Sequence, residues 1–346
     1  MMPPAVPISN CPGMRTFRHI DYLVFLMTVG QAFWICFDRV RRMLSSASSM
    51  RRALWTSRSR MALVSPKQRF RARSVLSIIV SWHANEVRHM EYARAEDGRP
   101  WFSARERVRK REFESVWDNE LRAVFRDVAP YYDLASDVAS LGLYSRWRRL
   151  FVSSINMRPA DKILDICAGT NAIGRGLLQR EPRVHVYALD KSEPMQQVGQ
   201  VSARSLGFEI ESVIGDVHQL PFPDESFDIV TLGWASRHLR IVDVITEVKR
   251  ILKPGGVFHH CDMLRPRNPL IERLYCAYLN ACVTFTALAF RSGPEAWRCR
   301  TYFVDTIRRF YSAEELSDVL FQVGYSNVLC WRALGGVVAF HKAVKV

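Results

Sequence analysis

The chain alternates between strand-like and helix-like segments from about residue 120 onward, and this alternation constrains its fold more than any other feature. Short apolar runs rich in Val, Ile and Leu alternate with longer stretches whose apolar residues recur at helical spacing, a pattern typical of parallel strands joined by crossover helices. Turn signals such as "PFPDES" and "KPGG" lie at the joints. The expected strands are 162–166, 184–190, 209–214, 227–232 and 256–262, and the expected helices are 172–180, 194–206 and 242–252.

The C-terminal part adds an expected helix at 313–323 and two strands, 325–332 and 337–342, which a turn at Gly335 and Gly336 joins as a hairpin. An antiparallel hairpin after a parallel series indicates an α/β fold with a doubly wound, mostly parallel, seven-stranded sheet. Such sheets bind ligands at the carboxyl ends of their strands. We therefore expect the functional residues of this domain, 121–346, to gather at that edge.

The positive charge of the chain is concentrated before this domain. The formal net charge is +15, but residues 1–119 hold 21 Lys and Arg against 10 Asp and Glu, which is +11 and leaves +4 for the remainder. The modest charge of the domain and its lack of a basic stripe with aromatic residues argue against nucleic-acid binding. The eight cysteines form no CxxC pair and have no His at ligand spacing, so we expect no metal site, no disulfide framework and a reducing compartment.

Three segments precede the domain. Residues 1–42 include an apolar run, 22–37, that is shorter than the roughly 20 residues that span a bilayer, so it is either a signal-like or anchoring segment or lies upstream of the true start. Residues 43–80 are rich in Arg and Ser and contain no acid, which is the composition of a mitochondrial transit segment; a disordered basic tail that touches RNA or acidic lipid is the alternative. Residues 81–120 are expected to be a linker running into the first helix of the domain.

The loop after the first strand is the strongest local signal for a ligand. In "KILDICAGTNAIGRGL" (162–177) it opens a helix, whose free N–H groups favour electron-rich ligand atoms, but it lacks the G-x-G-x-x-G spacing of dinucleotide sites. It fits the looser D-x-(G/A)-x-G-x-G pattern of S-adenosylmethionine sites, with Asp165 first and Gly169 at the tightest point. Asn171, of a residue type that tolerates a left-handed backbone, replaces the last glycine. An ordinary strand-to-helix turn is the alternative for this loop alone.

Two acids follow at the spacing of this class of site. Asp190 ends the second strand 25 positions after Asp165, where a carboxylate accepts hydrogen bonds from ribose hydroxyl groups. Asp216 and the Val217 backbone follow the third strand, where an adenine edge could be read. Each acid alone is as readily a helix cap, but the three pieces in this order indicate an S-adenosylmethionine-dependent methyltransferase.

Six longer motifs narrow this class. They are "VFRDVAPYYDLASDVASLGLYSRWR" (124–148), "LDICAGTNAIG", "LPFPDESFDIVT", "RILKPGG", "RTYFVDTIRRFYSAEEL" (300–316) and "LGGVVAFHKAVK" (334–345). Through them, residues 121–346 resemble the ubiquinone/menaquinone biosynthesis C-methyltransferase family, and the first and last motifs separate that family from other small-molecule methyltransferases. The resemblance implies a class I methyltransferase fold, S-adenosylmethionine as the donor, and methylation of a ring carbon of a prenylated quinol.

The resemblance also assigns residues. It implies donor contacts at Thr170, Asp190, Asp216 with Val217, and Gly233, where the family usually has Ser. It places Tyr132, Asp133 and Arg237 near the reacting ring, with His238 where the family has Asn. The chain departs from the family in its donor loop, at Ala168, Asn171 and Ala172. These departures concern the affinity for the donor more than the fold.

The expected chemistry gives the residues near the ring different tasks. A ring carbon becomes nucleophilic when its neighbouring hydroxyl loses a proton, so the site must align the reacting atoms and hold a base or a cation at that hydroxyl. We expect Arg237 to stabilise the oxyanion and His238, helped by Tyr132, to take the proton directly or through a water. Alternatively, the His238 imidazole only replaces the Asn amide as a hydrogen-bond partner.

The apolar stretch 268–290 has helical spacing and is expected to cover the ring and guide a prenyl tail, to lie at a membrane surface, or to form a packed helix or homodimer seam. Three functions remain open. The first is a quinol C-methyltransferase of ubiquinone synthesis in the mitochondrial matrix, associated with the inner membrane and a biosynthetic complex. The second is a catalytically weakened paralogue that binds the lipid quinol or acts as a scaffold. The third is a methyltransferase for another small hydrophobic acceptor.

Overall fold

The computed structural model describes residues 85–86, 100–117, 121–140, 142–289 and 300–346. All of the described residues belong to one compact unit, Trp82–Val346. The interpretations of residues 1–42 and 43–80, and of most of the linker before Ser103, therefore concern residues outside the described part.

One mixed sheet organises this unit, with the strand order β1-β7-β8-β6-β5-β2-β3-β4. Five strands are parallel: β2 (Lys162–Ile166), β3 (His185–Asp190), β4 (Glu211–Ile214), β5 (Phe227–Gly233) and β6 (Leu252–Met263). β8 (Val338–Lys345) runs antiparallel to β6 and to β7 (Tyr325–Ala333), and the two-residue β1 (Asn85–Glu86) extends the edge. The expected class I methyltransferase sheet, seven mostly parallel strands with an antiparallel C-terminal hairpin, is confirmed.

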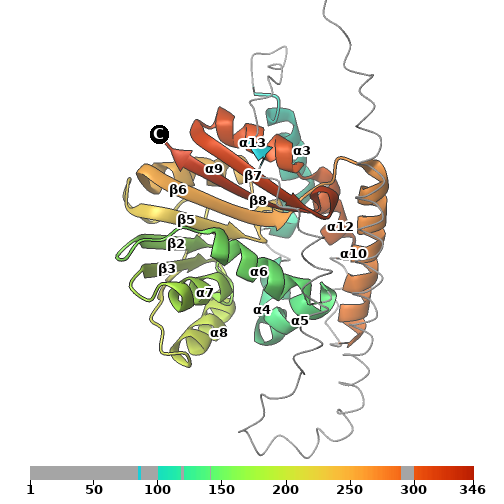
Figure 1. Cartoon of the computed structure of the whole chain (residues 1–346). Helices are drawn as coiled ribbons and strands as arrows, with labels where there is room; N and C mark the ends of the chain where they lie inside the picture. Colours follow the sequence, from blue (N-terminus) through green and yellow to red (C-terminus); the bar gives the residue numbers. More distant parts are fainter. Residues whose placement is uncertain (1–84, 87–99, 118–120, 141, 290–299) are drawn as a thin grey trace, which may run out of the picture. The chain divides into compact units, whose positions relative to one another are not determined.

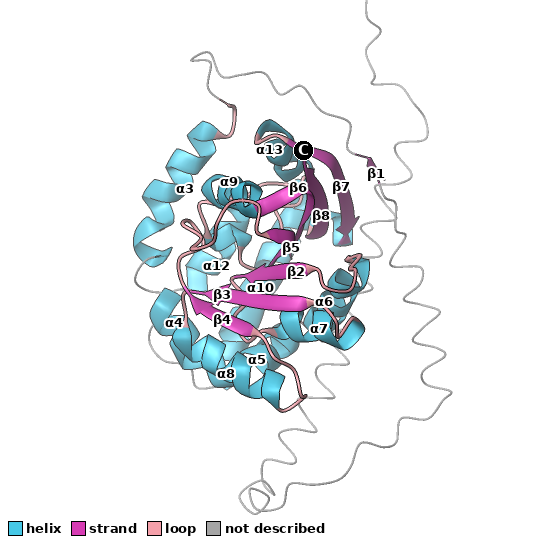
Figure 2. Cartoon of the chain, turned by 90° about the vertical axis from the view of Figure 1, so that its left-hand side faces the viewer, coloured by secondary structure: helices cyan, strands magenta, loops and turns pink. Residues whose placement is uncertain are grey.

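Helices cover both faces of the sheet, with α6 (Leu143–Ser154) and α7 (Ala172–Arg180) on one face and α9 (Ile241–Ile251) on the other (Figure 2). α8 (Glu193–Arg204) packs on β3 and β4, and α13 (Ala313–Gln322) packs on β7 and β8. The parallel strands are therefore covered as the crossover pattern of the sequence requires.

A further group of helices stands beside one end of the sheet (Figure 1). It comprises α4 (Leu121–Val128), η2 (Ala129–Tyr131), α5 (Tyr132–Ala139), α10 (Pro269–Ala289) and α12 (Arg300–Arg309), and α3 (Ser103–Ser115) precedes it in the chain. α10 packs against α5 and α12. Because α10 begins shortly after β6 ends, this group lies at the carboxyl ends of the parallel strands. The short turns η3 (Ser236–His238) and η4 (Leu334–Gly336) follow β5 and β7.

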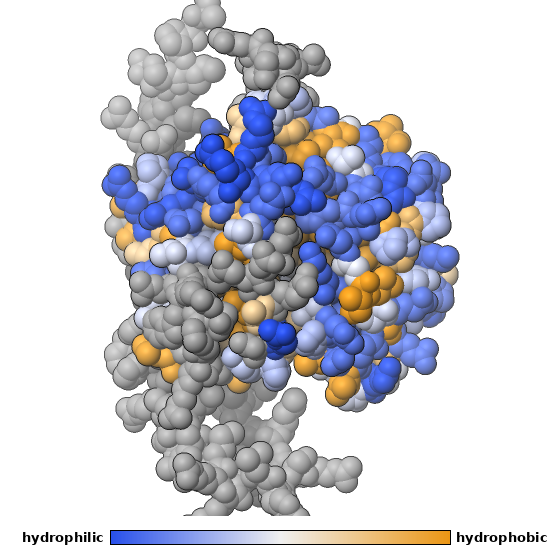
Figure 3. Space-filling view, turned by 180° about the vertical axis from the view of Figure 1, so that it is seen from behind, coloured by the Kyte–Doolittle hydropathy of each residue, from blue (hydrophilic) through white to orange (hydrophobic). Residues whose placement is uncertain are grey.

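The core explains the apolar runs of the sequence. β2 buries Ile163, Leu164 and Ile166 completely because both of its faces are covered. α9 buries one face, formed by Ile241, Val244, Ile245, Val248 and Ile251. On the uncovered part of the face shown in Figure 3, hydrophobic side chains form separate patches within a mostly hydrophilic surface. No helix in the described ranges is both long enough and apolar enough to cross a bilayer.

The largest difference from the expected strand boundaries is at the start of β6. β6 begins at Leu252 rather than at residue 256, because Leu252 pairs with Phe227 before the register shifts between Phe227 and Ile229. The KPGG turn therefore lies inside the strand as an irregularity, with Gly255 at φ +74°. Pairing across the sheet, which a local turn signal does not reveal, sets this boundary.

The buried histidine His259 on β6 makes stability depend on pH. His259 lies opposite Lys342 of β8 and is 4% exposed. Burial, reinforced by the Lys342 charge, lowers the pKa of His259 to about 3. Since histidine in an unfolded chain has a pKa of about 6.5, the stability contributed by neutral His259 is complete above that pH and is lost as the pH falls toward 3.

We expect His259→Leu to remove this part of the pH dependence. Between about pH 7.5 and about pH 5, the wild-type protein should lose about 2 kcal/mol of unfolding free energy relative to the variant. Chemical denaturation at the two pH values measures the difference. His185→Leu, at an exposed position of β3, is the matched control. Equal losses in the wild type and His259→Leu would contradict the expectation.

Candidate active site

The loop between β2 and α7 adopts backbone conformations typical of glycine at three positions, although it contains only one glycine. Cys167, Gly169 and Asn171 have φ angles of 52°, 51° and 57°. This left-handed region favours Gly, and Asn is among the residues that tolerate it best. A Cβ at Gly169 would also lie 3.2 Å from Met195 Cε. The altered sequence therefore keeps the backbone course that the donor pattern predicts.

The Asn171 side chain faces α8. Its Oδ1 accepts a hydrogen bond from Gln196 Nε2 at 2.9 Å, and the same Nε2 donates to the Gly169 carbonyl at 3.0 Å. α8 makes room for this side chain at Gly199, where a Cβ would lie 2.7 Å from Asn171 Nδ2 and 2.8 Å from the carbonyl carbon of Thr170. The residue that replaces the last glycine thus fixes the loop to α8.

Asp190 holds the same loop from the end of β3. Its Oδ2 accepts a hydrogen bond from the Gly169 N–H at 2.7 Å, and its Oδ1 accepts one from the Ser192 N–H at 2.8 Å. Burial raises the pKa of Asp190, and these backbone hydrogen bonds oppose the shift. Each carboxylate oxygen has two lone pairs, so Asp190 can also accept from hydroxyl groups of a ligand.

Thr170 connects the loop to α5. Its Oγ1 donates to Asp133 Oδ1 at 2.9 Å, and Arg175 Nη2 of α7 lies 3.3 Å from Asp133 Oδ2. Arg175 Nη1 also donates to the Thr170 carbonyl at 3.1 Å. Asp133, which the resemblance places near the ring, thus binds the donor loop.

A cavity of about 170 Å³, here called the donor cavity, lies over this loop. It is lined by four of the predicted donor residues, Gly169, Thr170, Asp190 and Gly233. A Cβ at Gly233 would lie 2.5 Å from Ile173 Cδ1, so the Ser usual in the family would require Ile173 to move. The Asp190 carboxylate can accept hydrogen bonds from ribose hydroxyl groups, and the apolar side chains beside it can pack against a flat base. This combination fits S-adenosylmethionine.

The other four predicted donor residues do not line the donor cavity. Asp165 is fully buried in β2, where Thr231 Oγ1 donates to its Oδ1 at 2.7 Å and burial raises the pKa of Asp165 to about 7. Asn171 faces α8, and Val217 belongs to the hydrophobic core. Asp216 accepts from His218 Nδ1 at 2.6 Å and lies 3.6 Å from Nζ of Lys191, a residue that does line the cavity. Their contacts with the donor stay predictions.

A larger cavity of about 290 Å³, here called the acceptor cavity, adjoins the donor cavity. Its lining is mostly apolar and comes from α4, α5, α6, α10 and the C-terminal hairpin. Three of the four residues predicted near the ring, Tyr132, Arg237 and His238, line it, and Asp133 does not. The residues that line both cavities are Phe125, Tyr132, Tyr144, Trp234 and His238. The structure therefore brings Tyr132, Arg237 and His238 together where the two cavities meet.

Arg237 is fixed by a buried ion pair. Its Nη1 lies 2.6 Å from Asp262 Oδ1, and the Asp262 side chain is fully buried at the end of β6. The other oxygen, Oδ2, accepts from the Ser236 N–H at 2.8 Å and from Ser236 Oγ at 2.6 Å. Burial alone would lower the pKa of Arg237, but the Asp262 carboxylate, together with Tyr275, Tyr132 and Tyr302, outweighs burial, and the pKa is raised. Arg237 is therefore a permanent cation at the acceptor cavity.

His238 is neutral in this environment. Its Nδ1 lies 2.6 Å from the Tyr302 hydroxyl of α12, and the two rings stack. Burial, followed by the charges of Arg237 and Arg109, lowers the pKa of His238 well below its usual range. Burial also raises the pKa of Tyr132, so its hydroxyl keeps its proton.

Several contributors were missed by the sequence reasoning. Gln196 and Gly199 carry no signal, because their role depends on how α8 packs against the loop. Tyr302 likewise becomes visible only through packing. Asp262 could have been found, since it lies near the carboxyl end of the fifth parallel strand, where such sheets place ligand-binding residues.

We expect Gly199→Ala to lower the affinity for S-adenosylmethionine about tenfold or more, because the added methyl group overlaps Asn171 and the Thr170 backbone. Calorimetric titration measures the change, with Val201→Ala, at a 69% exposed position of the same helix, as control. The double variant Gly199→Ala/Asn171→Gly should recover part of the affinity, because the Asn171 side chain is one of the two obstacles. Unchanged affinity in Gly199→Ala would refute this account of the loop.

Comparison with known proteins gives the family. A model of the ubiE/COQ5 methyltransferase family matches residues 114–345. The demethylmenaquinone methyltransferase of Streptomyces griseus subsp. griseus is 34% identical over 229 residues, which cover 66% of this chain and 95% of that protein. The ubiquinone/menaquinone biosynthesis C-methyltransferase UbiE of Burkholderia mallei is 31% identical over 239 residues, 67% of this chain and 97% of that protein.

Solved structures show weaker likeness. A SAM-dependent methyltransferase from Aquifex aeolicus has a TM-score of 0.42 at 17% identity, with 57% of this chain and 89% of that chain covered. The PH0226 protein from Pyrococcus horikoshii has a TM-score of 0.35 at 28% identity, with 39% and 63% covered. The assignment therefore depends on the family match and on the site. The chain belongs to the ubiE/COQ5 methyltransferase family and is a methyltransferase that uses S-adenosylmethionine.

Proposed function

We propose that this enzyme methylates a ring carbon of a prenylated benzoquinol in ubiquinone synthesis. The observation that carries the proposal is the shared wall between the donor and acceptor cavities, which brings a ring in one cavity next to a methyl donor in the other. The relatives are named for demethylmenaquinone and for ubiquinone/menaquinone biosynthesis, which supports a quinone-type acceptor.

The lining of the acceptor cavity supports a prenylated substrate. α10 contributes Tyr275, Tyr278, Leu279 and Val283, which supports a cover over the ring among the roles expected for 268–290. Arg237 and His238 contribute polar groups to the same lining. A quinol head group at Arg237 would leave its tail along α10, as an amphiphilic acceptor requires.

The position of α10 supports peripheral membrane association. Leu270 and Leu288, near its two ends, are 48% and 63% exposed, so apolar surface continues outside the cavity. A prenylated acceptor resides in a bilayer, and a helix beside the acceptor cavity shortens its transfer into the site. With the transit-like composition of residues 43–80, this leads us to propose the matrix face of the inner mitochondrial membrane as the location.

The residues at the shared wall have different roles in methyl transfer. When bound, S-adenosylmethionine supplies an electrophilic methyl group on a sulfonium. Arg237, oriented by Asp262, stabilises the negative charge that develops on the ring oxygen. Trp234 and Tyr144 line both cavities, exclude water and hold the ring against the donor.

The charge environment favours the hydrogen-bonding role of His238 over the role of a general base. An efficient base has a pKa near the working pH, whereas the pKa of His238 is lowered well below its usual range. A proton on His238 would face Arg237 and Arg109 in a buried site. We propose that neutral His238 hydrogen-bonds the ring hydroxyl, as the amide of Asn would, and that the proton leaves through water.

We expect His238→Asn to keep kcat within about tenfold of the wild type, since a lost general base costs about 100-fold or more. The pH profile of kcat/KM should show no inflection near pH 6.5, because His238 is already neutral there. Arg237→Lys, which keeps the charge but loses the planar guanidinium, should lose more activity than His238→Asn. A loss of 100-fold or more in His238→Asn, with an altered pH profile, would restore the base assignment.

The proposed function is tested with the full chain, S-adenosylmethionine and a reduced short-chain prenylated benzoquinol that lacks the ring methyl group. Mass spectrometry should detect a methylated product, and fragmentation should locate the new group on a ring carbon. Calorimetry of S-adenosylmethionine binding accompanies the assay. Donor binding without any transfer to the quinol would favour another small acceptor, and quinol binding without donor binding would favour the scaffold alternative.

A further inference from the structure

A buried arginine from outside the segment that matches the family reaches the active site. The family match begins at residue 114, whereas Arg109 lies in α3, Ser103–Ser115, and is 1% exposed. Arg109 Nη2 donates to the Arg237 carbonyl at 3.2 Å and to the Leu239 carbonyl at 2.9 Å. These two carbonyl groups flank His238. A side chain distant in sequence therefore binds the backbone of the turn that carries both polar ring residues, here called the 237–239 turn.

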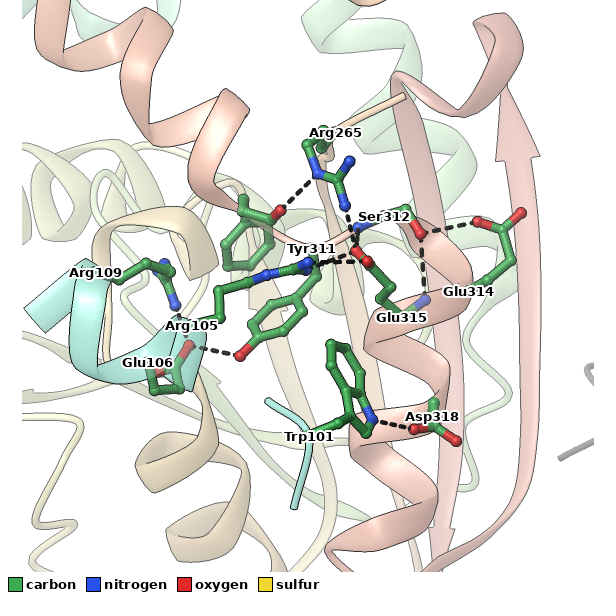
Figure 4. Close-up of polar contacts among 11 residues, drawn as sticks. Trp101, Arg105, Glu106, Arg109, Arg265, Tyr311, Ser312, Glu314, Glu315 and Asp318 are labelled. Carbon is green, nitrogen blue, oxygen red and sulfur yellow. Dashed lines mark hydrogen bonds and ion pairs between the residues drawn. The ribbon is translucent and has the colours of Figure 1, made fainter. Parts of the chain in front are cut away.

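α3 is attached to the rest of the domain by a set of polar contacts (Figure 4). The Trp101 indole N–H donates to Asp318 Oδ2 at 2.6 Å. Arg105 donates two hydrogen bonds to the Glu315 carboxylate, at 2.7 and 3.0 Å. Both acceptors belong to α13, whose N-terminus is closed by a capping box. α3 is thereby docked on α13, and the position of Arg109 is determined by that docking.

The buried Arg109 guanidinium is held by hydrogen bonds and lies against aromatic rings. Glu106 accepts from Arg109 Nη1 and from the Tyr311 hydroxyl, so one carboxylate serves two donors. The Arg109 guanidinium also lies over the Phe310 ring, 4.8 Å from its centroid, and 5.5 Å from the Trp117 centroid. Burying a cation is costly unless its donors are used. Here Nη1 donates to Glu106, and Nη2 donates to the two carbonyl groups of the 237–239 turn.

The 237–239 turn needs such a partner. Carbonyl groups at the end of a short 3-10 segment have no following turn to accept from. The side chains of the turn are held separately, Arg237 by Asp262 of β6 and His238 by Tyr302 of α12. Without Arg109 these attachments would remain, but the carbonyl groups of Arg237 and Leu239 would lose the hydrogen bonds that hold this side of the turn to α3.

We propose that Arg109 is a positioning residue for methyl transfer, holding the 237–239 turn so that Arg237 and His238 face the acceptor. This inference rests on the proposed function of these two residues and adds α3 to the active site. Arg109 itself lines neither the donor cavity nor the acceptor cavity. It acts through the backbone it binds and through the charge it places behind His238.

The charge of Arg109 affects the pKa of His238, which can be measured without turnover. The ionisable groups around His238 are Arg109 from α3, Tyr302 from α12, Arg237 beside it with Asp262 of β6, and Tyr132 of α5 at the cavity wall. The nearby Arg109 charge opposes protonation of His238. Removing it should therefore raise the pKa of His238 toward its ordinary value.

The test compares Arg109→Met and Arg109→Lys in the full chain, with Arg107→Met, at an exposed position of the same helix, as control. We expect Arg109→Met to lower kcat about 10- to 100-fold, as misplaced reacting groups do, with KM for S-adenosylmethionine changed less than about threefold. NMR titration of labelled histidine should show His238 protonating at higher pH than in the wild type. Arg109→Lys keeps the charge, but its single ammonium cannot reproduce the planar fork in which Nη1 donates to Glu106 while Nη2 donates to both carbonyl groups. It should therefore lower kcat and leave the titration of His238 near that of the wild type.

Each result decides the inference. A lower melting temperature with unchanged kcat and unchanged His238 titration in Arg109→Met would reduce Arg109 to a packing residue. If that variant does not fold, Arg109→Lys decides through the same comparison, since wild-type kcat in it would refute the need for the fork. If the wild-type protein does not methylate the quinol, the proposed function fails. The His238 titration, recorded without substrate, still reports whether Arg109 controls this site.

Discussion

The ion pair between Arg237 and Asp262 is the interaction on which the geometry of the site most depends. It joins the turn after β5 to the end of β6, two neighbouring strands of the sheet. Burying both charges sacrifices their hydration, which close contact and further hydrogen bonds must offset. Asp262 receives them from the Ser236 N–H, the Ser236 hydroxyl and the Met263 N–H. The same contacts that make the buried charge tolerable therefore fix the direction of Arg237.

Behind this pair, neutral polar groups connect the site to the C-terminal hairpin. His260 Nε2 lies 2.9 Å from Ser236 Oγ, and His260 Nδ1 lies 3.1 Å from His341 Nδ1 of β8. His341 Nε2 is 2.9 Å from the Ala313 carbonyl at the start of α13. Burial lowers the pKa values of both histidines, that of His341 to about 4, so the connection adds no charge near Arg237. The helix that docks α3 and the strand that supports Arg237 are thus parts of one buried network.

The sequence predicted those features that depend on local pattern or on neighbouring strand ends. β2 and α7 begin and end where their apolar patterns do, and Gly169, Asp190, Arg237 and His238 meet because parallel strands share one carboxyl edge. Features set by long-range packing were not predictable. The orientation of Asn171 depends on a glycine in another helix, and the support of the 237–239 turn comes from a residue more than one hundred positions earlier. No periodicity or motif encodes either relationship.

Long-range packing also explains how the chain accommodates His238 where the family has Asn. An imidazole in water titrates near neutral pH and could make the charge of the site variable. Here two guanidinium groups and burial oppose its protonation, and the Tyr302 hydroxyl occupies one ring nitrogen. What remains is a neutral group with a hydrogen-bonding atom at its edge, which is also what an amide offers. The substitution is therefore conservative in charge because of its surroundings, and Arg109 from α3 is one of the groups that make it so.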